Sequence, residues 1–154
     1  VAGPGRGNGR CALAHPLPLD GFGMQPLIIG AGLAGAAASI DLARAGLKPC
    51  LIERNPEPHD KICGEFLSGE AVAALTGLGV PPLALGAVPI TRVELWAGRR
   101  QAAAALPFPA LSLSRRVLDA ALVAKCVASV AAFHGGVAAN RVSGDGVHTS
   151  GGDV

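Results

Sequence analysis

The residues best suited to chemistry are a glycine-rich hexapeptide, Gly30 to Gly35 with the sequence GAGLAG, and a later acid, Glu53. In this G-x-G-x-x-G spacing the first glycine permits a tight turn, and the second lets backbone reach a pyrophosphate. The third glycine lets a helix and a strand approach each other closely. The pattern predicts a dinucleotide-binding turn, and the alternative is an Ala/Gly-rich strand-to-helix turn that holds no ligand.

The segments around this turn are of the kinds needed to position it. Leu27–Ile29 is a short apolar run typical of a buried parallel strand, Ala36–Ala45 predicts a helix, and Pro49–Ile52 predicts a second strand. Glu53 would end that second strand, where its carboxylate can accept hydrogen bonds from both hydroxyls of a ribose. It would repel a 2′-phosphate, which disfavours NADP. The alternative is a solvated acid that pairs with Arg54.

The rest of the chain predicts a mixture of helix and strand. Ser68 is a candidate N-cap for a helix through Leu75. Leu118, Leu122, Cys126 and Val130 recur every four residues, which gives a helix over 115–133 a buried stripe. The other expected elements are a loop over 55–67, a Pro/Gly-rich connection over 77–89, a hairpin of 93–96 with 102–106 in which Trp96 packs against the sheet, a strand over 137–139 and a Gly-rich tail from Val142.

Two further motifs narrow the class of protein. After Glu53 the chain continues through Lys61-Ile62-Cys63-Gly64, and residues 115–122 form an Arg-x-x-Leu-Asp-x-x-Leu pattern at the start of the predicted helix. Together with the glycine-rich turn, these motifs resemble FAD-dependent oxidoreductases of the p-hydroxybenzoate hydroxylase type, most of all their geranylgeranyl-reductase-like branch. The resemblance extends from Met24 to Val142.

The resemblance implies an α/β fold, a Rossmann-like FAD-binding domain of three layers with a parallel sheet and a β-ribbon. It implies FAD as cofactor, a small-molecule substrate, and NAD(P)H as a candidate external reductant. The flavin would carry out the redox chemistry while protein groups position it. The implied cofactor-binding residues are Gly30, Gly32, Ala34 and Gly35 at the pyrophosphate, Glu53 with its neighbour Arg54 at the ribose, Cys63 and Gly64 along the FAD, Arg115 on its helix, and Val142 near the adenine.

Within this class the cysteine-containing loop favours a reductase of isoprenoid or other alkene bonds. A flavin-dependent aromatic monooxygenase or a halogenase is the alternative reaction. A non-catalytic nucleotide-binding fragment of a decayed gene is the alternative of a different kind. The sequence assigns no catalytic residue. Such families carry a later Gly-Asp motif and a substrate domain that this sequence lacks, so we expect the chain alone to be inactive and not to retain FAD.

Arg115 and Cys63 each allow two interpretations. Arg115 stands at the positive end of the predicted helix, where a cation is unfavourable by roughly 0.3 kcal/mol or more, so a bound pyrophosphate would explain it. The alternative is an i,i+4 pair with Asp119, although an arginine that precedes the acid is the weaker order. Cys63 is interpreted as a residue that lines the cofactor rather than a catalyst, with a pKa that Lys61 could lower.

The two ends of the sequence carry weaker patterns. Residues 1–23 are rich in Gly, Pro and Arg, so we expect a disordered tail or a gene-model artefact, with Met24, the sole methionine, as the natural start. Residues 24–154 are then the N-terminal part of the FAD-binding domain. Gly144-Asp145-Gly146 is expected to be a surface turn, because no long apolar strand precedes it.

Composition disfavours several other functions. A formal charge of +2 without any Lys/Arg run speaks against nucleic acid or a lipid surface as a partner. The 4 cysteines lie far apart, which disfavours a zinc site and a disulfide framework and favours reduced thiols. The longest uncharged apolar stretch, Leu27–Ile40, is shorter than the roughly 20 residues of a membrane span. We therefore predict a cytoplasmic protein with no metal site and no transmembrane segment.

Overall fold

The computed structural model of the protein describes residues 25–63, 65–129, 132–143, 146–150 and 152–153. Its strands are β1 (Leu27–Ile29), β2 (Cys50–Glu53), β3 (Phe66–Ser68), β4 (Val88–Ala97), β5 (Arg100–Ser112), β6 (Ala132–Gly135), β7 (Ala139–Ser143), β8 (Gly146–Thr149) and β9 (Gly152–Asp153). Its helices are α1 (Leu33–Arg44), α2 (Gly69–Gly77), the 3₁₀ helix η1 (Pro82–Leu85) and α3 (Arg115–Ala128). Within these residues the strands form three sheets, ordered β1-β2-β6, β3-β5-β4 and β7-β8-β9.

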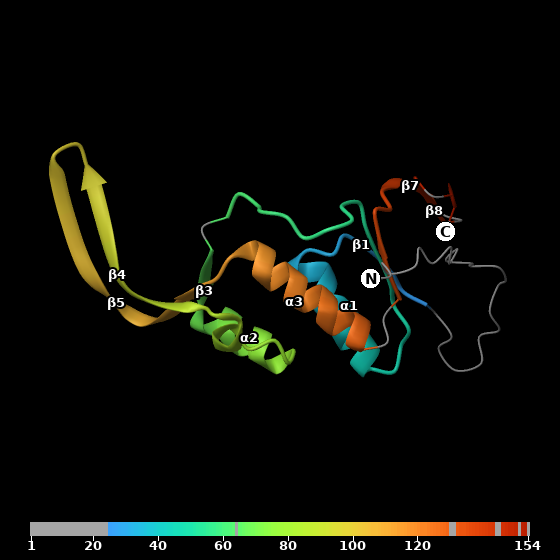
Figure 1. Ribbon diagram of the computed structural model, residues 1–154, viewed down its shortest axis with the longest axis horizontal. Coiled ribbons are helices and arrows are strands. Elements are labelled where there is room, and N and C mark those ends of the chain that lie inside the picture. The colour runs from blue at the N-terminus through green and yellow to red at the C-terminus, as the bar shows by residue number, and fades with distance from the viewer. Residues whose placement is uncertain (1–24, 64, 130–131, 144–145, 151, 154) are drawn as a thin grey trace, which may run out of the picture.

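The sheet β1-β2-β6 is parallel. Leu27 pairs with Cys50, and Cys50 pairs with Ala132, so β2 lies between the other two strands. Parallel neighbours need a crossover connection, and α1 supplies it between β1 and β2. Figure 1 shows α1 and α3 side by side in the centre of the molecule. The strand–helix–strand unit predicted around the glycine-rich turn is confirmed, and with it an α/β fold built on a parallel sheet.

Small side chains allow α1 and α3 to pack closely. Ala36 and Ile40 of α1 are fully buried, as are Leu118, Leu122 and Cys126, which belong to the predicted stripe of α3. The Sγ atom of Cys126 donates a hydrogen bond of 3.3 Å to the carbonyl oxygen of Ala36, which brings the two helices into direct contact. Burial of each Leu or Ile side chain contributes roughly 1.5–3 kcal/mol. This helix-on-helix contact therefore helps to fix α1, whose N-terminus begins in the glycine-rich turn.

α3 is shorter than the sequence predicts. The predicted helix runs through Phe133, but α3 ends at Ala128, and Phe133 lies in β6, the third strand of the parallel sheet. The N–H group of Ala132 donates to the carbonyl oxygen of Pro49 at 3.0 Å, and Phe133 is in register with Leu51. Pairing with the buried strand β2 satisfies these backbone groups, which explains why the chain leaves the helical pattern.

β4 and β5 form a long hairpin that projects from the helices, at the left of Figure 1. The hairpin predicted over 93–106 is confirmed but is longer, and β3, which the sequence assigns to a loop, pairs with β5 through Leu67 and Leu111. Nearly all side chains of the hairpin are exposed, because α2, β3 and η1 lie at its base and no other layer of the described residues covers the rest. Trp96, expected to pack against the sheet, is 66% exposed, so that expectation is wrong.

α2 begins at the predicted N-cap serine. The Oγ atom of Ser68 accepts a hydrogen bond of 3.3 Å from the N–H group of Ala71. This bond satisfies one of the N–H groups that have no partner inside the helix. The helix continues two residues past its predicted end at Leu75, and η1 occupies part of the Pro/Gly-rich connection that follows.

The C-terminal part contains more strand than predicted. The strand expected over 137–139 begins at Ala139, and the expected tail from Val142 contributes to β7, β8 and β9. Val142 pairs with Val147, which joins β7 to β8. The predicted tail over 1–23, Val130 of the α3 stripe, and Gly144 and Asp145 of the predicted turn lie outside the described residues. No helix in the described part of the chain is long and apolar enough to cross a bilayer.

Candidate cofactor site

The glycine-rich turn follows β1 directly and begins α1. Gly30 has a φ of +98°, a conformation that side chains rarely adopt, and its N–H group donates to the carbonyl oxygen of Ile52 at 2.8 Å. A Cβ atom at Gly35 would lie 1.9 Å from the carbonyl oxygen of Gly30, so no side chain fits between the helix and the strand. These two positions therefore require glycine for the reasons that the sequence pattern predicts.

The N-terminus of α1 has the features of an anion site. Its N-cap, Gly32, makes no side-chain capping bond, and the first turn contains no acidic residue. A Cβ atom at Gly32 would meet nothing within 4 Å, so open space lies above the turn. Ala34 in the first turn is also exposed. The first N–H groups of a helix carry partial positive charge, so this turn can bind phosphate oxygens.

Glu53 lies at the end of β2 and contacts the turn directly. Its Oε2 atom accepts a hydrogen bond of 2.8 Å from the N–H group of Ala31. Its Oε1 atom accepts from the N–H group of Asn55 at 3.0 Å and from the Nδ2 atom of Asn55 at 3.2 Å. Partial burial raises the pKa of Glu53, but these backbone hydrogen bonds, with the nearby charges of Lys61 and Arg54, outweigh it and lower the pKa below its usual value. The residue is therefore a carboxylate at neutral pH.

A cluster of charges joins the loop after β2 to α3. The buried carboxylate of Asp119 lies 2.5 Å from Lys61 Nζ through its Oδ2 atom. Its Oδ1 atom accepts from Arg115 Nε at 3.2 Å, and its Oδ2 atom accepts from Arg115 Nη2 at 3.4 Å. The i,i+4 pair that the sequence offers as the alternative for Arg115 is thus formed. It does not exclude a cofactor role, because part of the Arg115 side chain is still exposed.

Cys63 lies in the same loop and is exposed. The N–H group of Glu65 and the guanidinium of Arg115 lower the pKa of the Cys63 thiol. The sequence attributes such a shift to Lys61, but the Lys61 ammonium is paired with Asp119 and Arg115 has this effect instead. Glu65 has a φ of +54°, and its carbonyl oxygen accepts from Leu113 N at 3.0 Å, which ties the end of the loop to the start of α3.

The structure thus brings together most of the predicted site. The turn and Glu53 are hydrogen-bonded, and Glu53, Cys63 and Arg115 are connected through Lys61 and Asp119. Asn55, Lys61 and Asp119 are site residues to which the sequence analysis assigns no cofactor role, although the last two belong to the quoted motifs. Arg54 is exposed, Val142 lies exposed in β7, and Gly64 lies outside the described residues. The described residues contain no cluster of His, Cys, Asp and Glu that could hold a metal ion.

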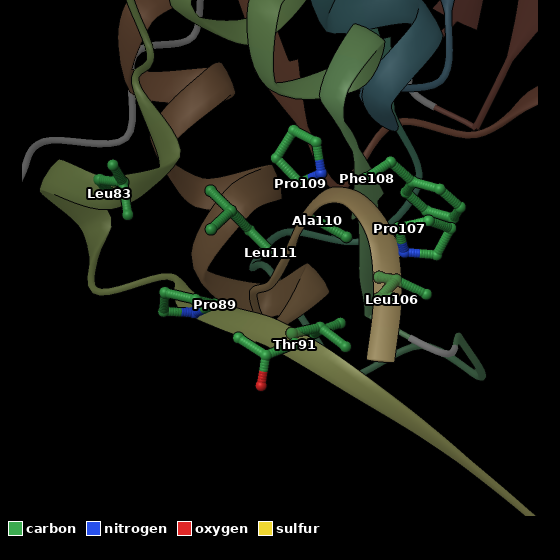
Figure 2. A pocket seen from close by; sticks show the side chains of 10 residues that line it. Leu83, Pro89, Thr91, Leu106, Pro107, Phe108, Pro109, Ala110 and Leu111 are labelled. Carbon is green, nitrogen blue, oxygen red and sulfur yellow. The ribbon is translucent and has the colours of Figure 1, made fainter. Parts of the chain in front are cut away.

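A separate apolar hollow of about 520 Å³ lies at the base of the hairpin (Figure 2). Its walls come from η1, β4 and β5 and are almost wholly apolar. They are formed by Leu83, Pro89, Ile90, Thr91, Leu106, Pro107, Phe108, Pro109, Ala110 and Leu111. No residue of the glycine-rich turn or of the charge cluster lines this hollow, so it is distinct from the candidate cofactor site.

The FAD binding domain family matches residues 24–101, which is half of the chain. The matched segment contains the glycine-rich turn, Glu53 and the loop that carries Lys61 and Cys63. It ends in the β4–β5 hairpin, so Arg115 and Asp119 lie beyond it. The match identifies FAD as the dinucleotide for which the turn is built.

Curated relatives match part of the chain. Menaquinone reductase of Mycolicibacterium smegmatis is 43% identical over 54 residues, which are 35% of this chain and 13% of that protein. The 3-hydroxybenzoate 6-hydroxylase of Klebsiella oxytoca is 39% identical over 61 residues, 40% of this chain and 15% of that protein. Squalene monooxygenase SE2 of Panax ginseng is 36% identical over 73 residues, 47% of this chain and 13% of that protein. The matches thus span a small part of each relative.

Solved structures share the fold. The tetrameric form of 2-methyl-3-hydroxypyridine-5-carboxylic acid oxygenase has a TM-score of 0.73 at 23% identity, over 86% of this chain and 37% of that chain. A geranylgeranyl bacteriochlorophyll reductase-like protein from Thermoplasma acidophilum has a TM-score of 0.65 at 21% identity, over 84% of this chain and 36% of that chain. The expected Rossmann-like FAD-binding fold is therefore confirmed, and the geranylgeranyl-reductase-like branch stays a prediction.

Proposed function

This chain belongs to the FAD binding domain family, and from that membership we propose that its glycine-rich turn, Glu53 and Arg115 hold the ADP half of an FAD in a flavin-dependent oxidoreductase. The observation that carries the proposal is the contact between Ala31 N and Glu53 Oε2 at 2.8 Å. It places a carboxylate beside the N-terminus of α1, where open space lies above Gly32, so a group for the ribose and a group for the pyrophosphate lie next to each other. The FAD supplies the redox chemistry when bound, and the residues of this chain bind and orient it.

The ribose would have to replace one of the existing hydrogen bonds of Glu53. A carboxylate offers about four acceptor positions, and Ala31 and Asn55 already fill three of them. Two ribose hydroxyls need two positions. The bond from Asn55 Nδ2, at 3.2 Å the longest of the three, is the one that a hydroxyl would displace. Asn55→Ala should therefore bind adenine nucleotides as tightly as the wild type does, or more tightly.

The pyrophosphate would lie over Gly32, with Arg115 as a cation beside it. The Arg115 guanidinium shares only part of its hydrogen-bonding capacity with Asp119, since a guanidinium has five N–H donors. Cys63 and Gly64 would continue along the FAD, and Val142 would lie near the adenine. Arg54, exposed beside Glu53, would add to the positive potential around the phosphates.

A titration of the whole chain with nucleotides tests this proposal. ADP should bind, and FAD should bind no more tightly than ADP, because the proposed site contacts only the ADP half; such binding is too weak to retain FAD during purification. FMN, which lacks the adenosine half, should not bind. Gly32→Val should abolish binding and keep the wild-type Tm, because a side chain there meets no protein atom but occupies the approach of the pyrophosphate. Glu53→Ala should weaken binding by roughly 1–3 kcal/mol. Unchanged affinity in Gly32→Val would overturn the proposed site.

For the substrate we propose a hydrophobic isoprenoid compound, reduced at the expense of NAD(P)H. The support is the 43% identity to a menaquinone reductase, the match to a squalene monooxygenase, and the Lys-x-Cys-Gly loop that resembles geranylgeranyl reductases. Hydroxylation of a small aromatic compound is the second candidate, favoured by the match to 3-hydroxybenzoate 6-hydroxylase over 61 residues. Incubation under ¹⁸O₂ separates them, since only hydroxylation places labelled oxygen in the product.

We also propose that the domain begins at Met24 and that the protein acts in the cytoplasm. The family match that starts at residue 24 supports the boundary. Removal of residues 1–23 should leave the Tm and the ADP affinity unchanged. A clear fall in either quantity would show that the segment is part of the domain.

A further inference from the structure

We propose that Asp119 is a positioning residue that fixes Lys61 and Arg115 as a pair of cations and holds the loop 54–63, with its Cys63 thiol, against the N-terminus of α3. Asp119 itself is buried beneath these side chains, with 5% of its side chain exposed. It would therefore act on a cofactor only through the two cations. The proposal rests on the proposed function only for the statement that these cations face a phosphate.

The contacts of Asp119 join segments that are far apart in the sequence. Lys61 lies 58 positions before it, in a loop whose residues 54 and 56–60 are all exposed. Lys61 joins this stretch to α3, because its ammonium donates a hydrogen bond to the buried carboxylate of Asp119. The neighbouring ion pair, Arg116 with Asp60, spans 3.9 Å between two exposed side chains. Exposed pairs of this kind contribute about 0–1 kcal/mol in general, so of these two ion pairs the one made by Asp119 is the one that can fix the loop.

The cluster of Lys61, Arg115 and Asp119 has a net positive charge. Lys61 and Arg115 carry two positive charges and Asp119 carries one negative charge, which leaves a surplus of one positive charge. The N-cap of α3, Ser114, makes no side-chain capping bond, and the first turn of α3 contains no acid. The cations therefore stand at a helix end that is itself partly positive. The carboxylate of Asp119 lowers the cost of this arrangement, and both cations stay partly exposed, Lys61 at 31% and Arg115 at 20% of their side chains, so an anion can reach them.

The pKa of the Cys63 thiol depends on the position of the loop relative to Arg115. The groups that act on its thiol are the N–H and carboxylate of Glu65 and the guanidinium of Arg115, with Lys61 two residues away in the loop. Loss of the Asp119 charge has opposite consequences under two interpretations. If Asp119 only contributes charge, its removal leaves Arg115 beside the thiol with less compensation, and the pKa of Cys63 falls further. If Asp119 positions the loop, the thiol separates from Arg115, and its pKa rises toward that of an ordinary cysteine.

The experiment compares variants of the Lys61–Asp119 pair with matched variants of the exposed Arg116–Asp60 pair. Asp60→Asn is the control for Asp119→Asn, and Arg116→Ala is the control for Lys61→Ala. Loop opening is followed by digestion with a Glu-specific protease, which can cleave after Glu53 and Glu65 at the two ends of the loop but not at the Glu57–Pro58 bond, since cleavage of a folded chain needs local opening. Asp119→Asn and Lys61→Ala should be cut about tenfold faster than the wild type. Asp60→Asn and Arg116→Ala should stay within about twofold of it, and Lys61→Arg should restore protection.

Alkylation of Cys63, followed against pH by mass spectrometry of its peptide, supplies the second readout. The midpoint should move upward in Asp119→Asn and stay unchanged in Asp60→Asn. A lower midpoint, or digestion of Asp119→Asn at the wild-type rate, overturns the proposal. If Asp119→Asn does not fold, Lys61→Ala decides, because it leaves the Arg115–Asp119 pair in place. Neither readout needs a cofactor, so a failed ADP titration and a failed loop experiment are distinguishable.

Discussion

The nucleotide-binding half of the molecule and the β4–β5 hairpin are built from similar residues but bury them to very different degrees. Both are rich in Ala and Leu: α1 reads LAGAAASIDLAR, and β5 reads RQAAAALPFPALS. Ala36 in α1 is fully buried beneath α3, whereas Ala102 to Ala105 in β5 are exposed. Figure 1 shows the cause, since α1 lies beside α3 while the outer part of the hairpin projects beyond the helices.

This difference shows that burial here depends on layers and not on composition. An alanine is useful in α1 because it lets another element approach, and Gly35 extends the same principle to the contact with β1. In the hairpin the same small side chains meet no second layer within the described residues. We therefore expect the two regions to respond very differently to equivalent substitutions.

The largest difference should come from adding one methyl group to a glycine in each region. In Gly35→Ala the new Cβ atom would lie 1.9 Å from the carbonyl oxygen of Gly30, so the turn must separate from the helix. We expect the free energy of unfolding to fall by more than about 4 kcal/mol. Gly98→Ala at the hairpin tip adds a side chain at a φ of +59° with nothing within 4 Å, which should cost about 1–2 kcal/mol. Urea denaturation of the three proteins measures both values, and similar losses would contradict the comparison.

A leucine truncation in each region should give the next largest difference. Leu122 of α3 is fully buried, so Leu122→Ala should lower the free energy of unfolding by roughly 2–5 kcal/mol. Leu95 of the hairpin is 67% exposed, so Leu95→Ala should change it by less than about 0.5 kcal/mol. Chemical denaturation followed by circular dichroism provides the test. A loss above the smaller value in Leu95→Ala would mean that the hairpin is covered in solution.

The acid dependence of stability should distinguish Glu53 from a hairpin carboxylate. The pKa of Glu53 is lowered in the folded state, so its contribution is fully present above the ordinary carboxyl pKa and is lost as the pH falls through the lowered value. Glu53→Gln should therefore flatten the acid side of the stability curve. The charge-matched Glu94→Gln keeps the Ala31 and Asn55 contacts and should retain the wild-type curve. Thermal melts between neutral and acid pH measure this, and equal flattening in both variants would contradict the assignment.

The smallest expected effect is spectroscopic. Trp96 is the sole tryptophan and is 66% exposed in the hairpin, so its fluorescence should already be accessible to acrylamide in the native protein. Unfolding should then increase quenching only slightly. Strong protection of Trp96 in the native state would indicate that another molecule or segment covers the hairpin in solution.

Much of the nucleotide-binding half could be predicted because its signals are local. The glycine spacing, the three apolar residues of β1 and the acid at the end of β2 lie within 27 consecutive positions, from Leu27 to Glu53. The four-residue repeat of Leu118, Leu122 and Cys126 likewise predicts one buried face of α3. Each of these patterns follows from the geometry of a single turn, strand or helix. These features can therefore be predicted without knowing which distant residues lie nearby in the fold.

The predictions that were wrong concern features that depend on residues distant in the sequence. The helical pattern predicts that Phe133 continues a helix, but Phe133 pairs with Leu51 of β2 and so belongs to β6. β3 forms because β5 supplies a partner for Leu67, and a three-residue strand has little signal of its own. The exposure of Trp96 could not be predicted either, since a strand pattern shows which residues share a face but not whether another layer covers that face.

The sequence by itself determined the cofactor turn, the position of Glu53 and the class of fold, because short-range spacing encodes them. Only the tertiary structure decided which side chains complete the site. Asp119 and Lys61 stand 58 positions apart, and neither pattern in the sequence shows that they meet. A buried carboxylate requires compensating charge from whatever lies nearest in space. That requirement selects its partners only after the loop and α3 have packed together.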